Sequence, residues 1–114
     1  MASAHLTARG FEVLDRNFRT RHGELDLVVR DPRHLVFCEV KTRVARQSTG
    51  AYPPLSSVGP DKRRRLRRMA REWLRERARE PRPGQGDIRF DAIGVTVSPD
   101  GRLLALEHLE AAFW

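Results

Sequence analysis

Two strand-like segments separated by a short turn restrict the fold of this chain more than any other feature. From Glu24 to Arg30 and from Leu35 to Lys41, even and odd positions separate into two faces of different polarity, which is the pattern of half-buried β-strands. The sequence Asp-Pro-Arg-His at 31–34 between them is typical of a tight turn, because proline fixes φ and aspartate accepts backbone hydrogen bonds. The two segments are therefore predicted to form an antiparallel hairpin.

The clearest helix lies in the second half of the chain. Its apolar residues recur at spacings of three and four, the pattern of one buried face, and they are Leu66, Met69, Ala70, Trp73, Leu74 and Ala78. Pro81 and Pro83 are predicted to end this helix. Because Trp73 falls on the apolar face, it is predicted to belong to the core rather than to stack on a nucleic-acid base.

Weaker patterns predict the remaining elements. They are a helix at 3–9 ended by Gly10, a strand at 11–14, a polar turn at 15–23, loops at 42–61 and 84–87, strands at 88–97 and 103–107 joined by a turn at 98–101, and an apolar tail at 109–114 that docks on the core. This mixture predicts the α/β class, with a central mixed sheet flanked by helices. At 114 residues, one domain spanning 1–114 is expected.

Composition excludes several classes of protein. Hydrophobic residues make up 39% and charged residues 32%, which is too apolar for a disordered chain and too polar for a membrane protein. No apolar run approaches the roughly 20 residues of a membrane helix, and residues 1–9 lack the apolar core of a signal peptide. The single cysteine, Cys38, is predicted to be a buried, reduced thiol. We therefore expect a cytoplasmic protein that does not contact a membrane.

Positive charge is concentrated in one segment. Between Lys62 and Glu80 stand ten basic and three acidic residues, which equals the whole net charge of +7. A localised excess of this kind is typical of a surface that binds the phosphates of DNA or RNA, although a solvated helix face has the same composition. The residues expected to contact phosphate are Lys62, Arg63, Arg64, Arg67, Arg68 and Arg43.

The predicted hairpin opposes two carboxylates. If residues 31–34 form a four-residue loop, Asp26 stands directly across from Glu39, and Glu24 across from Lys41. Opposed side chains have Cβ atoms about 4.5–5.5 Å apart, where two like charges destabilise the sheet. A positive group is therefore expected between Asp26 and Glu39. Mg²⁺ or Mn²⁺ suits this position, because Mg²⁺ takes oxygen ligands from one or two carboxylates and keeps several waters.

Lys41 lies two residues beyond Glu39 and shares its face of the strand. An ammonium there can position water and stabilise the charged transition state of phosphodiester hydrolysis. Only 2 of the 22 basic residues are lysine, so Lys41 departs from a strong preference for arginine. A structural interpretation stays open, since charged residues on an edge strand prevent aggregation. Glu24 would form either a simple ion pair with Lys41 or a support for the site.

These motifs resemble the YraN family of uncharacterised bacterial proteins. The similarity extends from about Leu6 to Phe113, and its residues are Gly-Glu-Leu-Asp-Leu-Val at 23–28, Leu-Val-Phe-Cys-Glu-Val-Lys-Thr-Arg at 35–43, Asn17, Arg19, Gly50, Lys62 and Arg89-Phe90-Asp91. The resemblance implies a restriction-endonuclease-like fold, also seen in archaeal Holliday-junction resolvases, whose site is an Asp followed by Glu-x-Lys. On that resemblance Asp26 and Glu39 would ligate the metal and Lys41 would be the catalytic lysine. A homodimer, as in the resolvases, stays open.

One position departs from the pattern that the resemblance implies. In this fold an acidic residue on the first helix usually completes the site, whereas no acidic residue precedes Glu12 here, so the first helix is expected to be cut short. Two functions stay open. The first is a Mg²⁺-dependent endonuclease, selective for the structure of its DNA or RNA substrate. The second is a non-catalytic nucleic-acid-binding or protein-binding module with an incomplete metal site. Asp91 is predicted to be a buried structural residue with an arginine partner.

Overall fold

The computed structural model describes residues 2–45, 59–77 and 87–113. Its elements are α1 (Ala2–Ala8), β1 (Glu12–Thr20), β2 (Gly23–Arg30), β3 (His34–Val44), α2 (Pro60–Glu76), β4 (Asp87–Val97) and β5 (Leu103–Phe113). The predicted α/β class is confirmed, and the arrangement is consistent with a restriction-endonuclease-like core. Neither helix is long and apolar enough, within the described ranges, to cross a membrane.

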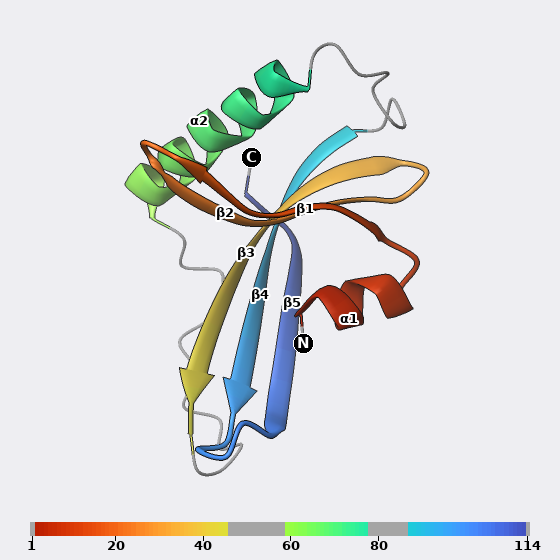
Figure 1. The fold of residues 1–114 in the computed structure, drawn as a ribbon, viewed down its shortest axis with the longest axis vertical. Helices are drawn as coiled ribbons and strands as arrows, with labels where there is room; N and C mark the ends of the chain where they lie inside the picture. The colour runs from red at the N-terminus through yellow and green to blue at the C-terminus, as the bar shows by residue number, and fades with distance from the viewer. Residues whose placement is uncertain (1, 46–58, 78–86, 114) are drawn as a thin grey trace.

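The five strands form one mixed sheet in the order of the chain. Neighbouring strands are antiparallel except β3 and β4, which pair in parallel. A parallel pair needs a crossover connection, and α2 lies in that connection. Figure 1 shows the sheet strongly twisted, so that the β1–β2 hairpin runs across the direction of β3, β4 and β5.

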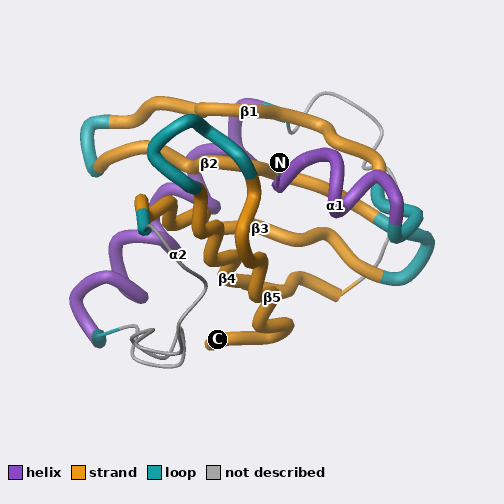
Figure 2. The backbone as a smooth tube through the Cα atoms, turned by 90° about the horizontal axis from the view of Figure 1, so that it is seen from below, coloured by secondary structure: helices purple, strands orange, loops and turns teal. Residues whose placement is uncertain are grey.

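Each face of the sheet is covered by one helix. Leu66, Met69, Ala70 and Trp73 of α2 pack with Leu35 and Phe37 of β3, whereas Ala2 and Leu6 of α1 pack with Val36 and Cys38. Figure 2 shows the two helices on opposite sides of the sheet. Since side chains alternate along a strand, the odd-numbered side chains of β3 belong to the α2 face. Glu39 and Lys41 are therefore on the side of the sheet that α2 covers.

The apolar face of α2 is the one that the sequence predicts. Pro60 stands in its first turn, where the missing N–H of proline costs nothing. Trp73 is 3% exposed, and its Nε1 donates to Oδ2 of Asp15 at 3.0 Å, which confirms its place in the core. The helix ends at Glu76, and Ala78 and both predicted terminating prolines lie outside the described residues.

Two strands are longer than their sequence patterns predict. Residues 15–20, predicted as part of a polar turn, instead continue β1, because they pair with β2 from Asp15–Val28 to Thr20–Gly23. As an edge strand, β1 needs no regular apolar alternation. The predicted docking tail from 109 likewise continues β5, which extends to Phe113. Only short turns therefore connect β1 to β2 and β4 to β5.

The predicted loops fall mainly on residues that the structure does not describe. Of the loop at 42–61, Thr42–Val44 instead belong to β3, and Pro60 and Asp61 begin α2. Residues 46–58 lie outside the described ranges, as do residues 84–86 of the second loop, whose last residue, Asp87, begins β4. The turn at 98–101 is confirmed, because the Gly101 N–H donates to the Ser98 carbonyl at 2.9 Å. Cys38 is buried, with 1% of the residue exposed, and its thiol is free, as the sequence predicts.

Candidate functional site

The hairpin brings Asp26 close to Glu39 but does not pair the two residues. From Leu27–Cys38 to Arg30–Leu35 the register is the predicted one. The ladder ends there, one pair before the carboxylates, and beyond its end Oδ2 of Asp26 accepts a hydrogen bond from the Val40 N–H at 2.7 Å. The predicted direct opposition of Asp26 and Glu39 is therefore wrong. At this point a side chain of β2, rather than its backbone, binds the backbone of β3.

Glu39 is held by a lysine from α2. Nζ of Lys62 forms an ion pair with Oε1 of Glu39, whose side chain is 12% exposed. The second oxygen, Oε2, is buried and has no hydrogen-bond partner among the described residues. Buried polar atoms nearly always have such a partner, and a missing one costs about 1–3 kcal/mol. Oε2 is therefore an acceptor suited to a cation or to a hydrogen-bond donor that the described residues do not supply.

The charges around Asp26 act on one another. Burial raises the pKa of the Asp26 carboxyl, and the hydrogen bond from Val40 opposes this shift. The negative charges of Glu39 and Glu24 raise that pKa further, whereas Lys62 lowers it. Asp26, Glu39 and Lys62 thus share one electrostatic environment, in which Lys62 supplies the positive charge expected beside the carboxylates.

Lys41 and Glu24 do not form the predicted pair. The β2–β3 ladder does not extend to these residues. Glu24 instead pairs with Arg19, its neighbour on β1, with Oε2 of Glu24 3.5 Å from Nε of Arg19. The interpretation of Glu24 as a cross-strand partner of Lys41 is therefore wrong, because the strands have separated before that point. Lys41 is exposed and so accessible to a ligand on the Glu39 face.

A cavity of about 320 Å³ adjoins Asp26 near the first residues of α1. The side chains around it are Ala2, Ser3, Arg16, Asn17, Asp26, Leu27, Val40 and Thr42. Asn17 has a φ of 52°, a left-handed conformation that asparagine tolerates better than most residues. The sequence gives no role to Arg16 or Asn17, because a polar stretch predicts a turn. The signal that points to Asn17 is its presence among the residues shared with YraN proteins.

The carboxylates fit a hydrated hard cation. Asp26 and Glu39 supply two carboxyl groups, and one oxygen of Glu39 lacks a partner within the described residues. Across the part of the chain that the structure describes, no three or more His, Cys, Asp or Glu side chains are grouped so as to hold a metal. Mg²⁺ needs only one or two carboxylates, because waters complete its octahedral shell. Asp26 and Glu39 would therefore be the residues that hold Mg²⁺ or Mn²⁺.

The predicted phosphate-contacting residues lie in three places. Lys62 forms an ion pair with Glu39 and is therefore part of the carboxylate site. Arg63, Arg64, Arg67 and Arg68 follow it along α2, and Arg64 pairs with Asp61 at 3.5 Å. Arg43 lies two residues beyond Lys41 on β3. The basic part of α2 thus begins at the carboxylates and extends away from them.

A second cluster of charges, around Asp91, is buried in the sheet. Asp91 is fully buried, and its two oxygens accept hydrogen bonds from Nε and Nη2 of Arg89 at 2.8 and 2.9 Å. The predicted arginine partner is therefore confirmed. Nε2 of His108 lies 2.8 Å from the same carboxylate, and Nδ1 of His108 lies 3.1 Å from Arg9. Because arginine only donates, Nδ1 must accept and Nε2 must carry the proton.

Asp26→Asn is expected to stabilise the metal-free protein at neutral pH. A carboxyl whose pKa is raised by folding binds its proton more tightly in the folded state, so its ionised form costs stability above that pKa. Asparagine removes this cost and can still accept from Val40, so the free energy of unfolding should rise. Urea unfolding in EDTA measures the difference. The gain should disappear below the ordinary aspartate pKa of about 3.9, and a gain that persists there would contradict this explanation.

Comparison with known proteins places these residues in a family. Residues 1–95 match the model of the uncharacterised protein family UPF0102. A UPF0102 protein of Frankia alni is 45% identical over 113 residues, which cover 99% of this chain and 88% of that protein. One of Streptomyces griseus is 46% identical over 101 residues, 89% of this chain and 80% of its own. A UPF0102 protein of Geobacter sulfurreducens is 40% identical over 116 residues, which cover 99% of this chain and 82% of that protein. None of these names states an activity.

Proposed function

This chain belongs to the uncharacterised protein family UPF0102, the YraN family, and we propose that it binds nucleic acid and hydrolyses phosphodiester bonds with the help of Mg²⁺ or Mn²⁺. The observation that carries this proposal is the buried Oε2 of Glu39, which has no partner within the described residues. The charge of Glu39 also acts on Asp26, whose pKa it raises. A protein that keeps a carboxylate oxygen buried without a donor loses stability unless a ligand compensates. A hard cation compensates through oxygen coordination.

Each residue of the proposed site has a distinct task. Asp26 and Glu39 hold the cation, and Lys62 fixes the orientation of Glu39 by binding its Oε1. Lys41, on the same face of β3, places an ammonium where it can stabilise negative charge on the phosphate in the transition state. When bound, the cation would neutralise phosphate oxygens and make a water molecule a stronger acid.

The location of both lysines supports the proposal. Lys41 and Lys62 are the only 2 lysines among the 22 basic residues. Lys62 contacts Glu39, and Lys41 stands two residues from Glu39 on β3. A compact ammonium is a point charge suited to a small site, whereas arginine presents a wide planar fork. The arginine-rich remainder of α2 then supplies the general attraction for phosphates.

A second candidate function is a nucleic-acid-binding or protein-binding module without catalysis. The observation that favours it is the small number of acidic groups at the site. α1 lies next to the cavity at Asp26 yet contains no acidic residue. With two carboxylates the site would bind a cation weakly. A protein that binds nucleic acid without cutting it needs the basic residues of α2 but not a metal site.

Thermal melts across a metal titration test the proposed cation site. A cation that binds only the folded wild type stabilises it by about 2.7 kcal/mol at a hundredfold excess over Kd. Glu39→Gln should show almost no shift with Mg²⁺ or Mn²⁺. Glu76→Gln, an exposed change of the same kind at the end of α2, should shift like the wild type. Equal shifts in both variants would mean that Glu39 is structural.

Cleavage assays separate the two candidate functions. The purified protein is incubated with single-stranded, duplex, flap and four-way-junction substrates of DNA and of RNA, with Mg²⁺, with Mn²⁺ and with EDTA. We expect cleavage that requires the metal and is lost in Glu39→Gln. Binding without cleavage in every metal condition would contradict hydrolysis and favour the non-catalytic module.

A further inference from the structure

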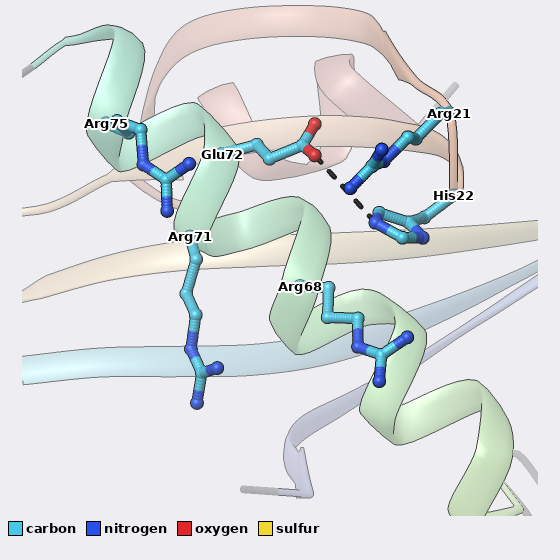
Figure 3. A pocket seen from close by; sticks show the side chains of 6 residues that line it. All are labelled: Arg21, His22, Arg68, Arg71, Glu72 and Arg75. Carbon is cyan, nitrogen blue, oxygen red and sulfur yellow. Dashed lines mark ion pairs between the residues drawn. The ribbon is translucent and has the colours of Figure 1, made fainter.

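A cavity of about 300 Å³ lies between α2 and the turn that joins β1 to β2. Six side chains line it, as Figure 3 shows: Arg21 and His22 from the turn, and Arg68, Arg71, Glu72 and Arg75 from α2. The residues of α2 recur every three or four positions and so lie along one side of the helix. We call these six residues the arginine pocket. It contains none of the carboxylate-site residues.

The arginine pocket holds positive charge that its own residues do not balance. Four guanidinium groups stand against the single carboxylate of Glu72. That carboxylate faces the turn in Figure 3, with Oε1 3.9 Å from Nε2 of His22. Elsewhere on the described surface, Arg9, Arg30 and Arg77 each pair with a carboxylate. No such pair is formed by the four arginines of the pocket within the described ranges.

Besides the contact between His22 and Glu72, packing holds the two walls of the pocket together. Gly23, which follows His22, has a φ of 131°, and a Cβ at this position would lie 3.5 Å from Sδ of Met69. Met69 is itself 2% exposed. The close approach of Gly23 to the helix therefore fixes the turn against α2 and keeps the guanidinium groups near one another. The backbone of both walls is therefore already in place for an anion, so that only the side chains need to become ordered on binding.

We propose that the arginine pocket binds a phosphate group of a nucleic-acid strand, which rests on the proposed function and adds a second anchor for the same strand. Guanidinium groups bind phosphate through two parallel hydrogen bonds. Several of them around one cavity can contact several oxygens of one phosphate. The phosphate is either an internal phosphodiester or a terminal phosphomonoester, which carries about −1.5 to −2 charges.

The position of the pocket along α2 sets the length of a suitable probe. Lys62 lies at the carboxylates, and Arg68 and Arg75 follow it on the same helix. At 1.5 Å per residue they are displaced by about 9–20 Å along the helix axis. Stacked nucleotides advance about 3.4 Å each, so a strand of about ten nucleotides is long enough to occupy both places.

The test measures binding of a ten-nucleotide single strand in EDTA, across a series of salt concentrations. Arg71→Gln with Arg75→Gln removes two charges from the pocket. Arg33→Gln with Arg102→Gln removes two exposed charges from the turns after β2 and β4. The pocket variant should bind more weakly, with a salt dependence reduced by about 0.7 for each phosphate that the protein no longer neutralises. The control variant should keep the wild-type slope. Both should melt near the wild type without ligand, because all four side chains are exposed.

The same strand with and without a 5′- or 3′-phosphate identifies the source of the phosphate. A preference for a phosphorylated end that the pocket variant lacks indicates a terminal phosphate. If strands with and without a terminal phosphate bind the wild type equally, and both bind the pocket variant more weakly, the pocket holds an internal phosphodiester. Wild-type binding by the pocket variant, or an equal weakening of binding in both variants, would overturn the pocket proposal and leave the proposed function standing.

Melts in inorganic phosphate distinguish failure of the proposed function from failure of the pocket. If no strand binds the wild type, the nucleic-acid function fails. Phosphate that then raises the melting temperature of the wild type and the control, but not of the pocket variant, supports the pocket as a phosphate site. No difference among the three proteins would overturn it.

Discussion

Asp91→Ala is expected to lower the free energy of unfolding by about 3–5 kcal/mol. Asp91 is fully buried, and its carboxylate accepts from Arg89 and lies 2.8 Å from Nε2 of His108. Alanine would remove the carboxylate that accepts both hydrogen bonds of Arg89 and leave Glu110, 3.9 Å away, to compensate its charge. Removing one partner of a buried ion pair is strongly destabilising, because the other charge is left buried and poorly compensated. The loss is a large part of the 5–15 kcal/mol by which most domains are stable.

Urea unfolding followed by circular dichroism measures this effect. Asp91→Asn keeps the shape and one acceptor oxygen but not the charge, so it should fall between the wild type and Asp91→Ala. Asp61→Ala is the matched control, because the side chain of Asp61 is 98% exposed at the start of α2. The control should change stability far less. Similar destabilisation at Asp61 and Asp91 would show that the buried network does not hold the sheet together.

Lys41→Ala is expected to reduce metal-dependent cleavage by about 10²–10³-fold, the usual effect of removing one group that stabilises transition-state charge. Binding of the uncleaved strand should change only a few-fold, because the contribution of Lys41 is made in the transition state. Single-turnover cleavage rates and equilibrium binding in EDTA measure the two effects separately.

Two further variants define what Lys41 does. Lys41→Arg keeps the charge but replaces the compact ammonium with a planar fork, and we expect it to restore little of the rate. Arg33→Ala removes an exposed positive charge from the turn before β3, at the opposite end of that strand from Lys41, and should leave the rate unchanged. An equal loss of binding and cleavage in Lys41→Ala would instead mean that Lys41 only binds phosphate.

Local patterns were sufficient to predict the hairpin and the buried face of α2. The register from Leu27–Cys38 to Arg30–Leu35 follows from the loop at 31–34, since loop length sets the pairing in a hairpin. The burial of Leu66, Met69, Ala70 and Trp73 follows from helical periodicity. Both features depend on residues close together in the chain.

The features that could not be predicted depend on residues far apart in the chain. Lys62 meets Glu39 because α2 covers the odd-numbered side chains of β3, and the sequence does not state which face a crossover helix covers. The ladder ends at Asp26 because its side chain binds the Val40 N–H, a competition that strand alternation does not reveal. The edge strand β1 carries polar residues on both faces, so its pairing with β2, rather than its own pattern, makes it a strand.

From the parallel pairing of β3 with β4 we expect a definite order in which the site is assembled during folding. The β2–β3 hairpin joins neighbours in sequence, so Asp26 and Glu39 approach each other at small loop-closure cost. Pairing of His34 with Asp87 joins distant parts of the chain and is correspondingly slow. Lys62 belongs to the crossover that must close at this later step. We therefore expect the two carboxylates to approach each other before Lys62 reaches Glu39.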